Sequence, residues 1–375
     1  MKQVLLGAAA AVVAVLGIGA VWNRPAAPPS RVVPDNGGAL ASVAIHFDPR
    51  VADDVGDTYQ DLFREMPATV EVYIVVEKQA DFDQLHGLLR RWNIAAPERF
   101  HAVVVGKPIT TWSRDRYTLL VEGRRPVLLV PPRPTEGNPA RHNDWEAPFA
   151  LAAAIPGLRT RTAEAMFEGG DITATEGHVF ATALLRERNR GGDLDDPEQL
   201  RAWLRYTTGK QPVLLGDTLA DVPGHHICMF LSPLDDHRVM VGDPDLGIAL
   251  FDRSGSDPAA LPLPIDRRED TLRRFRNVIA QLAAEGFEVI RVPLVPLSDG
   301  LTYVTYNNAL LEHRDGVLHA YLPQFDIPAL DQAGRRLWEA QGAVVHPIRV
   351  ARVYRFNGAV RCLVNILARY SSANT

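Results

Sequence analysis

The chain has 375 residues, of which 46% are hydrophobic and 23% are charged, values that are ordinary for a soluble globular protein. This length accommodates one large domain or two smaller ones. The formal net charge of −5 shows no basic excess, which argues against nucleic acid or an anionic membrane surface as the partner and suits a cationic substrate.

The first 22 residues have the composition of an export segment. Lys2 precedes a long apolar run that carries no charge until Arg24, and small residues near its end suit a cleavage site. The run is also close to the ~20 residues that span a bilayer, so residues 1–22 are expected to be a signal peptide or a membrane anchor that tethers the protein. The predicted location is therefore exported: periplasmic, secreted or membrane-anchored. Residues 23–41, rich in Pro and Gly, are expected to form a flexible linker.

From residue 42 to the C-terminus, segments of β-type composition alternate with segments of helical period. β-branched and aromatic residues bounded by Gly, Pro and Asp predict strands over residues 69–77, 100–105, 117–122, 126–130, 178–182, 226–231, 238–242, 287–292 and 317–322. Apolar residues at helical spacing predict helices over residues 57–66, 83–92, 144–155, 196–206, 268–286 and 328–342. This alternation predicts a single α/β domain over residues 42–375. The recurrence of the helices indicates a repeated strand–helix unit, although the units share no obvious sequence.

Four stretches carry titratable side chains beside the predicted strands. They are TTWSRDRY with Trp112 and Asp115, FEGGDI with Glu168 and Gly169, PGHHICMF with His226 and Cys228, and GAVRCLVN with Cys362. Acidic, histidine and cysteine side chains together fit chemistry on a guanidinium group. A carboxylate grips this planar cation with two parallel hydrogen bonds, and a thiolate can be present near neutral pH to attack its carbon. A histidine can protonate the departing nitrogen and then take a proton from water.

Each of these residues also has a purely structural alternative. A free cysteine is among the most buried residue types, and a histidine within an apolar run is commonly a core residue. Asp115 could cap a strand end or pair with a neighbouring arginine, and Glu168 could cap a turn. The cluster of His225, His226, Asp235, Asp236 and His237 matches no common ligand spacing, so no metal site is predicted.

The four stretches resemble the motifs of the guanidine-modifying superfamily, and most closely those of agmatine deiminases and bacterial-type peptidylarginine deiminases. The resemblance extends over residues 42–370. It implies a pentein fold, in which five strand–helix units form a closed, five-fold pseudo-symmetric α/β propeller with the active site on its axis. It also implies that GAVRCLVN is a C-terminal strand that carries the nucleophile Cys362, and that His226 is the general acid and base. Asp115 and Glu168 would then hold the guanidinium, and no cofactor or metal is required.

The resemblance further implies the surroundings of the substrate and one departure from the family. Trp112, Gly169, Asn308 and Arg361 are assigned to substrate binding. Cys228 stands where the family usually has a second carboxylate, two residues after the histidine. If Cys228 and Cys362 face the same pocket, they could form a disulfide in an oxidising compartment; two isolated core thiols are the alternative.

The sequence therefore predicts a hydrolase that converts a guanidinium group to a ureido group and ammonia through a thiouronium on Cys362. The substrate is a peptidyl-arginine or a small arginine-like compound. Export favours protein or peptide arginine, because agmatine enzymes usually serve intracellular pools. Two alternatives stay open: a catalytically impaired binding protein of the same fold, which the loss of the second carboxylate would explain, and an amidinotransferase, which passes the amidine to an amine.

Overall fold

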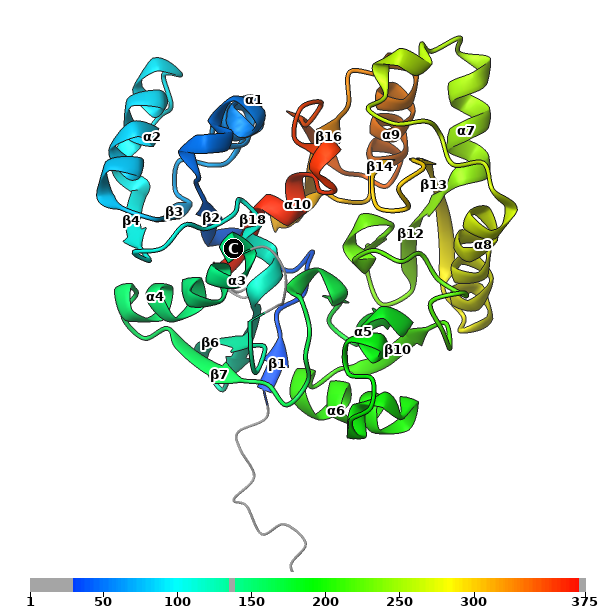
Figure 1. Ribbon diagram of the computed structural model, residues 1–375, viewed down its shortest axis with the longest axis horizontal. Coiled ribbons are helices and arrows are strands. Elements are labelled where there is room, and N and C mark those ends of the chain that lie inside the picture. Colours follow the sequence, from blue (N-terminus) through cyan, green and yellow to red (C-terminus); the bar gives the residue numbers. More distant parts are fainter. Residues whose placement is uncertain (1–29, 135–138, 371–375) are drawn as a thin grey trace, which may run out of the picture.

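The computed structural model describes residues 30–134 and 139–370, so the predicted export segment lies outside the described residues. Within these residues the strands form five sheets of three or four strands each (Figure 1). None of the helices in the described part of the chain is long and apolar enough to cross a membrane.

The five sheets are built from strands that are close together in sequence, except that β18 joins the first sheet and β1 joins the second. The first sheet contains β18 (Val364–Arg369), β2 (Leu40–His46), β3 (Glu71–Val76) and β4 (Phe100–Val104). The second contains β1 (Ser30–Val32), β5 (Thr118–Glu122), β6 (Arg125–Val130) and β7 (Arg159–Thr162). The third contains β10 (Gln211–Leu215), β9 (His178–Thr182) and β8 (Thr173–Ala174). The fourth contains β11 (Leu231–Pro233), β12 (Arg238–Asp243), β13 (Glu288–Pro296) and β14 (Tyr303–Thr305). The fifth contains β15 (Leu310–Arg314), β16 (Val317–Gln324) and β17 (Val344–Arg349).

Every sheet contains the same three-strand core, an antiparallel pair followed by a parallel pair. The antiparallel pairs are β18–β2, β5–β6, β8–β9, β11–β12 and β15–β16, and the parallel pairs are β2–β3, β6–β7, β9–β10, β12–β13 and β16–β17. Parallel strands need a long crossover connection, and helices supply it in each case. The repeated strand–helix unit that the sequence indicates is therefore present, while its arrangement as a five-fold pseudo-symmetric propeller stays a prediction.

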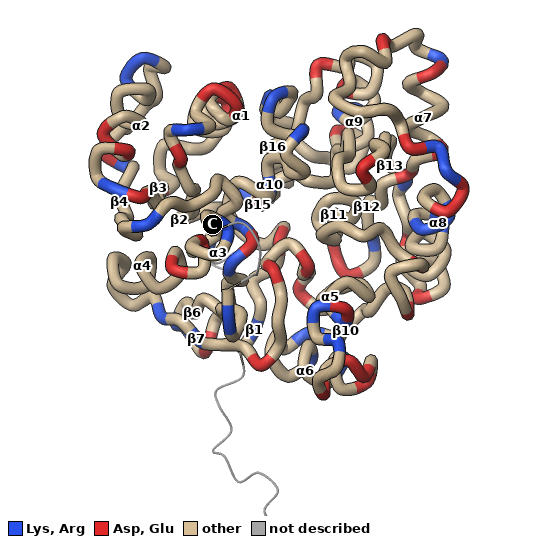
Figure 2. The backbone as a smooth tube through the Cα atoms, in the orientation of Figure 1, with Lys and Arg blue, Asp and Glu red and all other residues tan. Residues whose placement is uncertain are grey.

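The helices lie around the outside of the sheets in the view of Figure 1, except α3 (Pro139–Asn143), which lies near the middle. They are α1 (Ala52–Glu65), α2 (Gln79–Arg91), α3 (Pro139–Asn143), α4 (Ala147–Ala154), α5 (Ala183–Arg188), α6 (Pro197–Thr208), α7 (Pro244–Arg253), α8 (Glu269–Ala284) and α9 (Pro328–Ala340). Each amphipathic helix buries one apolar stripe; in α8 this stripe contains Phe275, Val278 and Leu282. Acidic and basic residues are mixed along these outer helices (Figure 2).

A short turn or helix directly precedes the first strand of each antiparallel pair. These segments are η3 (Ser113–Arg116) before β5, η5 (Gly169–Asp171) before β8, η7 (Ile227–Met229) before β11, the Asn307–Asn308 pair before β15, and α10 (Val360–Leu363) before β18. η3 contacts both α10 and η5, and η5 contacts η7. α10 lies near the middle of the molecule in Figure 1. The repeated unit thus brings five equivalent segments, distant in sequence, to one place.

Three sequence predictions need correction. Residues 30–41 belong to the fold and not to the linker, because β1 pairs with β5 and β2 already begins at Leu40. The predicted strand over residues 226–231 is instead the turn η7 followed by β11, and its apolar residues are buried without forming a ladder over their whole length. Cys362 lies in α10, before the C-terminal strand and not within it.

Candidate active site

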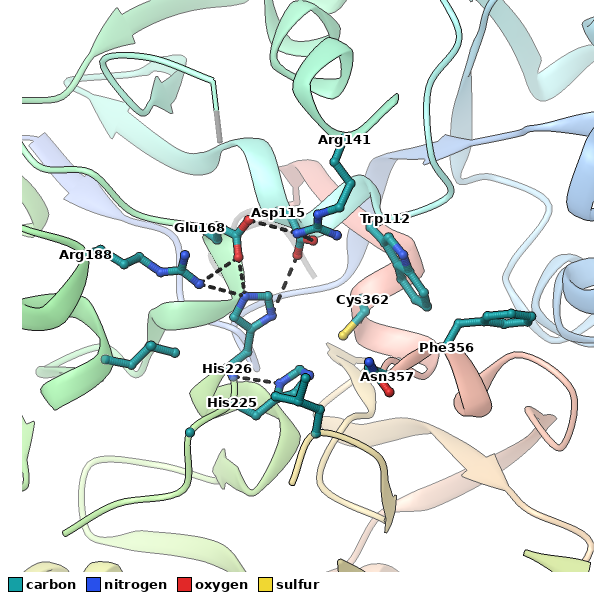
Figure 3. Close-up of a pocket in the computed structure, with 13 residues that line it drawn as sticks. Trp112, Asp115, Arg141, Glu168, Arg188, His225, His226, Phe356, Asn357 and Cys362 are labelled. Carbon is teal, nitrogen blue, oxygen red and sulfur yellow. Dashed lines mark hydrogen bonds and ion pairs between the residues drawn. The ribbon is translucent and has the colours of Figure 1, made fainter. Parts of the chain in front are cut away.

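A cavity of about 370 Å³ opens where these segments meet. The four residues predicted to be catalytic, Cys362, His226, Asp115 and Glu168, all line this cavity, and Trp112 forms part of the same wall (Figure 3). The wall also contains Arg141, Arg188, His225, Phe356 and Asn357. The sequence-predicted constellation is therefore one spatial cluster.

Two glycines allow η5 to approach its neighbours closely. A methyl group at Gly169 would lie 2.1 Å from the backbone oxygen of Arg114, which belongs to η3. A methyl group at Gly170 would lie 2.6 Å from Nδ1 of His226. Any side chain at either position would push the carboxylates and the imidazole apart. Gly169 therefore serves the packing of the site, and it is buried at the base of the loop that carries Glu168.

Glu168 is surrounded by cationic side chains. Its Oε1 accepts hydrogen bonds from Arg116 Nη1 at 2.9 Å and Arg141 Nη2 at 2.8 Å. Its Oε2 lies 2.7 Å from Arg188 Nη2 and 2.8 Å from His226 Nε2. Burial opposes the ionisation of Glu168, but His226 and Arg188 outweigh it and hold the pKa of the carboxyl well below its usual range. Glu168 is thus a carboxylate that orients the imidazole.

His226 lies between the two acidic residues. Its Nε2 contacts Glu168, and its Nδ1 is 3.8 Å from Oδ1 of Asp115. Burial disfavours the imidazolium, yet the charge of Asp115 and the neighbouring Cys362 and Glu168 side chains raise the pKa of His226 well above its ordinary value. The ring is therefore protonated near neutral pH and can act as an acid. The adjacent His225 differs, because burial lowers its pKa to about 3 and keeps it neutral.

Cys362 is buried, and its sulfur points toward the imidazole rings of His225 and His226 (Figure 3). A hydrogen bond from Cys228 has the largest effect on the pKa of Cys362 and lowers it, burial raises it, and His226 lowers it further, to about 5. Cys228, in contrast, has a pKa raised well above that of a free thiol, first by its hydrogen bond to Cys362 and then by burial. Cys362 is the thiolate of the pair and Cys228 the thiol.

The two cysteines are free and share one hydrogen-bond donor. Nδ2 of Asn308 lies 3.3 Å from Sγ of Cys362 and 3.5 Å from Sγ of Cys228. The disulfide is therefore not formed in this structure, yet the thiols are not isolated core residues either. Cys362 lines the cavity, and Cys228 lies behind it.

Two further residues that the sequence assigned to substrate binding, Asn308 and Arg361, make structural contacts outside the cavity. Asn308 is fully buried, and its Oδ1 accepts a hydrogen bond from the backbone N–H of Arg361 at 3.0 Å, so it holds the start of α10. The side chain of Arg361 pairs with Asp35 at 3.0 Å. Neither residue is among those that line the cavity, because each is engaged by partners behind its wall.

The sequence reasoning missed Arg141 and Arg188. Nη2 of Arg141 lies 3.0 Å from Oδ2 of Asp115 and 2.8 Å from Oε1 of Glu168, and Nε of Arg188 lies 2.7 Å from Oδ2 of Asp171. Arg141 lies in α3 and Arg188 ends α5, and nothing in the sequence of these short helices shows which carboxylate each arginine contacts. Among the described residues, no group of His, Cys, Asp and Glu side chains could hold a metal ion.

No protein-family model matches the chain, and no curated protein matches it in sequence. Solved structures do match it. Agmatine deiminase from C. jejuni gives a TM-score of 0.67 at 15% identity, over 91% of this chain and 97% of that chain. Agmatine deiminase from Enterococcus faecalis gives a TM-score of 0.67 at 12% identity, over 93% and 98%. A protein provisionally assigned as a peptidyl-arginine deiminase gives 0.68 at 13% identity, over 91% and 99%. The chain therefore has the mixed α/β pentein fold of the guanidine-modifying deiminases, the superfamily that its sequence motifs resemble.

Proposed function

We propose that the protein is a guanidine hydrolase that converts a guanidinium group to a ureido group and ammonia. The observation that carries this proposal is that Cys362, His226, Asp115 and Glu168 line one cavity. A thiolate, an imidazolium and two carboxylates are the groups that this reaction requires. The surroundings of Cys362, His226 and Glu168 favour the thiolate, the imidazolium and the carboxylate, respectively.

In the first half of the reaction, Asp115 and Glu168 hold the planar cation by hydrogen bonds. The Cys362 thiolate attacks the central carbon, and a carbon–sulfur bond forms as the adduct becomes tetrahedral and neutral. The imidazolium of His226 then donates its proton to one nitrogen, which leaves as ammonia. The product of this half is a positively charged thiouronium on the sulfur and a neutral imidazole.

In the second half, the neutral His226 takes a proton from water, and the oxygen attacks the same carbon. The carbon–sulfur bond then breaks and returns the Cys362 thiolate. Formation of the ureido carbonyl releases one proton to solvent, where it converts the ammonia from the first half to ammonium. His226 is protonated again, so the site is restored for the next cycle.

We propose peptide or protein arginine as the substrate class and an exported location for the protein. The location rests on the composition of residues 1–22. The cavity wall includes two exposed apolar side chains, Leu301 at 41% and Phe356 at 49% exposure. They could contact apolar parts of a peptide on either side of the arginine, which supports this substrate class. Exposed apolar surface beside a polar cavity is typical of a site that contacts a larger ligand.

A ureido assay under reducing conditions tests the proposal. The substrates are a blocked arginine amide, free arginine and agmatine, and we expect product from at least the blocked amide and none from Cys362→Ala. Absence of ureido product with every substrate would overturn the hydrolase. A new guanidino compound formed from an added amine, with release of the substrate's own amine and no ureido product, would identify an amidinotransferase instead.

A second candidate, a guanidinium-binding protein without turnover, is favoured by one observation. Cys228 stands two residues after His226, where the family motif has a carboxylate, so one group that would orient the substrate is absent. Calorimetric titration with the blocked arginine amide separates the candidates, because the binding protein takes up the ligand and releases it unchanged.

A further inference from the structure

Arg141 projects into the cavity and bridges the two carboxylates of the site (Figure 3). Its Nη2 atom lies 3.0 Å from Oδ2 of Asp115 and 2.8 Å from Oε1 of Glu168. The carboxylate side chains are 4% and 5% exposed, whereas the arginine is 29% exposed. A guanidinium of the chain itself thus has the contacts that the substrate guanidinium needs in the proposed reaction.

Of the two carboxylates, Glu168 has no oxygen left for a second cation. Oε2 of Glu168 contacts both Arg188 and His226, at 2.7 Å and 2.8 Å. Oδ1 of Asp115 has no hydrogen-bond partner among the described residues, and Nδ1 of His226 lies 3.8 Å from it. A substrate guanidinium that uses both carboxylates must therefore take the place of one of the arginines.

Arg141 is the arginine best able to leave. Arg116 is fully buried, and Arg188 is held by Asp171 at 2.7 Å in addition to Glu168. Arg141 belongs to the five-residue helix α3, and none of the residues of that helix is buried. Withdrawal of its side chain breaks two ion pairs but disturbs no packed core.

We propose that Arg141 is an internal competitor for the guanidinium subsite, so that a substrate binds only after displacing it. This inference rests on the proposed function for its account of where the substrate binds. The apparent affinity of a ligand equals its affinity for the open site multiplied by the fraction of molecules whose site is open. If the arginine fills the subsite in about 90% of molecules, guanidinium ligands bind about tenfold more weakly than the open site allows.

The first test is calorimetric titration of agmatine into Cys362→Ala, which cannot turn the ligand over. We expect the double variant Cys362→Ala, Arg141→Ala to bind agmatine about tenfold more tightly than Cys362→Ala alone. Addition of Arg133→Ala to Cys362→Ala is the matched control, because it removes the same charge from an exposed position. Equal affinity with and without Arg141 would overturn the inference.

A second ligand separates competition for the subsite from simple loss of positive charge. Putrescine carries an ammonium group where agmatine carries its guanidinium, so it has the same charge but lacks the planar fork. We expect Arg141→Ala to increase agmatine binding by a larger factor than putrescine binding. An equal gain for both ligands would mean that the arginine acts only as a charge, and would reject its role as a competitor.

Thermal unfolding supplies a readout that does not depend on turnover. Arg141→Ala leaves two buried carboxylates without this partner, so its melting temperature is expected to fall. Millimolar guanidinium chloride should then raise the melting temperature of Arg141→Ala more than that of the wild type, with sodium chloride as the control for ionic strength. An equal response of the two proteins contradicts the inference.

The outcomes also separate this inference from the proposed function. If the wild type makes a ureido product and Arg141→Ala binds agmatine no more tightly, the hydrolase stands and the competitor is rejected. If Arg141→Ala binds agmatine more tightly but no variant with an intact cysteine makes product, the subsite is correct and the hydrolase is rejected.

Discussion

Asn308 connects Cys362, the proposed nucleophile, to Cys228. Its amide nitrogen lies between the two sulfurs, and its amide oxygen accepts the N–H of Arg361 at the start of α10. N–H donors stabilise a sulfur anion in the way that they stabilise other anions. The amide, the Cys228 thiol and the His226 imidazolium together favour the thiolate form of Cys362.

This arrangement predicts a bell-shaped dependence of kcat/KM on pH. Cys362 must be ionised, and its pKa of about 5 places the rising limb near pH 5, since below that value the thiol is protonated. His226 must be protonated, and its pKa is raised above 6.5, so the falling limb lies above pH 6.5, where the ring loses its proton. Initial rates of ureido formation between pH 4 and 10, at constant ionic strength, check both limbs.

Cys228→Ala is the diagnostic variant for the acidic limb. It removes the hydrogen bond that most lowers the pKa of Cys362, so the rising limb should move to higher pH while the falling limb stays in place. An acidic limb that stays near pH 5 in this variant would contradict the role assigned to the Cys228 thiol.

At the scale of single residues, the sequence predicted which four side chains come together but not the arginines that contact them. The residue types of Cys362, His226, Asp115 and Glu168 already fit guanidinium chemistry, and the fold places all four around one cavity. Arg141 could not be predicted in the same way. Its contact with Asp115 and Glu168 depends on where α3 lies after folding, and no local pattern encodes that position.

At the scale of elements, the site is made by short turns in place of long helices or strands. The loop that carries Glu168 ends in η5, which contacts η3 and η7, and these contacts are possible because Gly169 and Gly170 have no side chains. The sequence predicted the amphipathic helices well, as in α8 and α9, because a buried stripe repeats over several turns. It missed η7, because a short apolar run has no period that separates a turn from a strand.

Gly170→Ala should separate the geometry of the site from the stability of the fold. The added methyl would lie 2.6 Å from Nδ1 of His226, so the ring must shift, which disturbs its contact with Glu168. Loss of an aligned general acid and base commonly costs ~10²-fold or more in rate, and we expect a fall in kcat of this size. Overpacking should lower the free energy of unfolding by about 1–3 kcal/mol. Ureido assays and urea denaturation measure the two effects.

Gly224→Ala is the matched control for this substitution. Gly224 lines the same cavity, but a methyl group there would meet nothing within 4 Å. We expect it to leave kcat and stability close to those of the wild type. If both alanine variants lost activity equally, bulk in the cavity and not displacement of His226 would be the cause.

At the scale of the whole molecule, the last strand of the described chain completes the sheet that contains β2, β3 and β4. The C-terminal strand β18 pairs with β2, so the sheet beside the nucleophile is complete only when the last strand has joined the first unit. Cys362 lies immediately before β18. The position of the nucleophile therefore depends on contacts between residues more than three hundred positions apart.

Asp35 contacts the segments that lead into two of the sheets and a strand of a third. Its Oδ1 lies 3.0 Å from Nη2 of Arg361 in α10 and 3.2 Å from Nη2 of Arg114 in η3, and its Oδ2 accepts from Thr173 Oγ1 at 2.8 Å in β8. The sequence assigned this residue to a flexible linker, because the surrounding Pro and Gly residues are typical of one. Composition shows that a segment lacks regular structure, but not that its one carboxylate will meet two buried arginines.

Asp35→Asn should therefore destabilise the whole molecule. The substitution keeps the size of the side chain but leaves the positive charges of Arg114 and Arg361 in a mostly buried setting without their anion, and removal of one partner of such a cluster costs about 2–4 kcal/mol. Urea denaturation followed by circular dichroism measures this loss. Asp252→Asn, which breaks the exposed pair with Arg267 at 2.7 Å, is the control and should change stability little because solvent screens that pair. Equal stability of the two variants would show that Asp35 is as dispensable as a surface charge. A loss confined to Asp35→Asn would show that residues 30–41 contribute to the stability of the domain. They supply the carboxylate that pairs with Arg114 and Arg361, which lie in the same segments as Asp115 and Cys362.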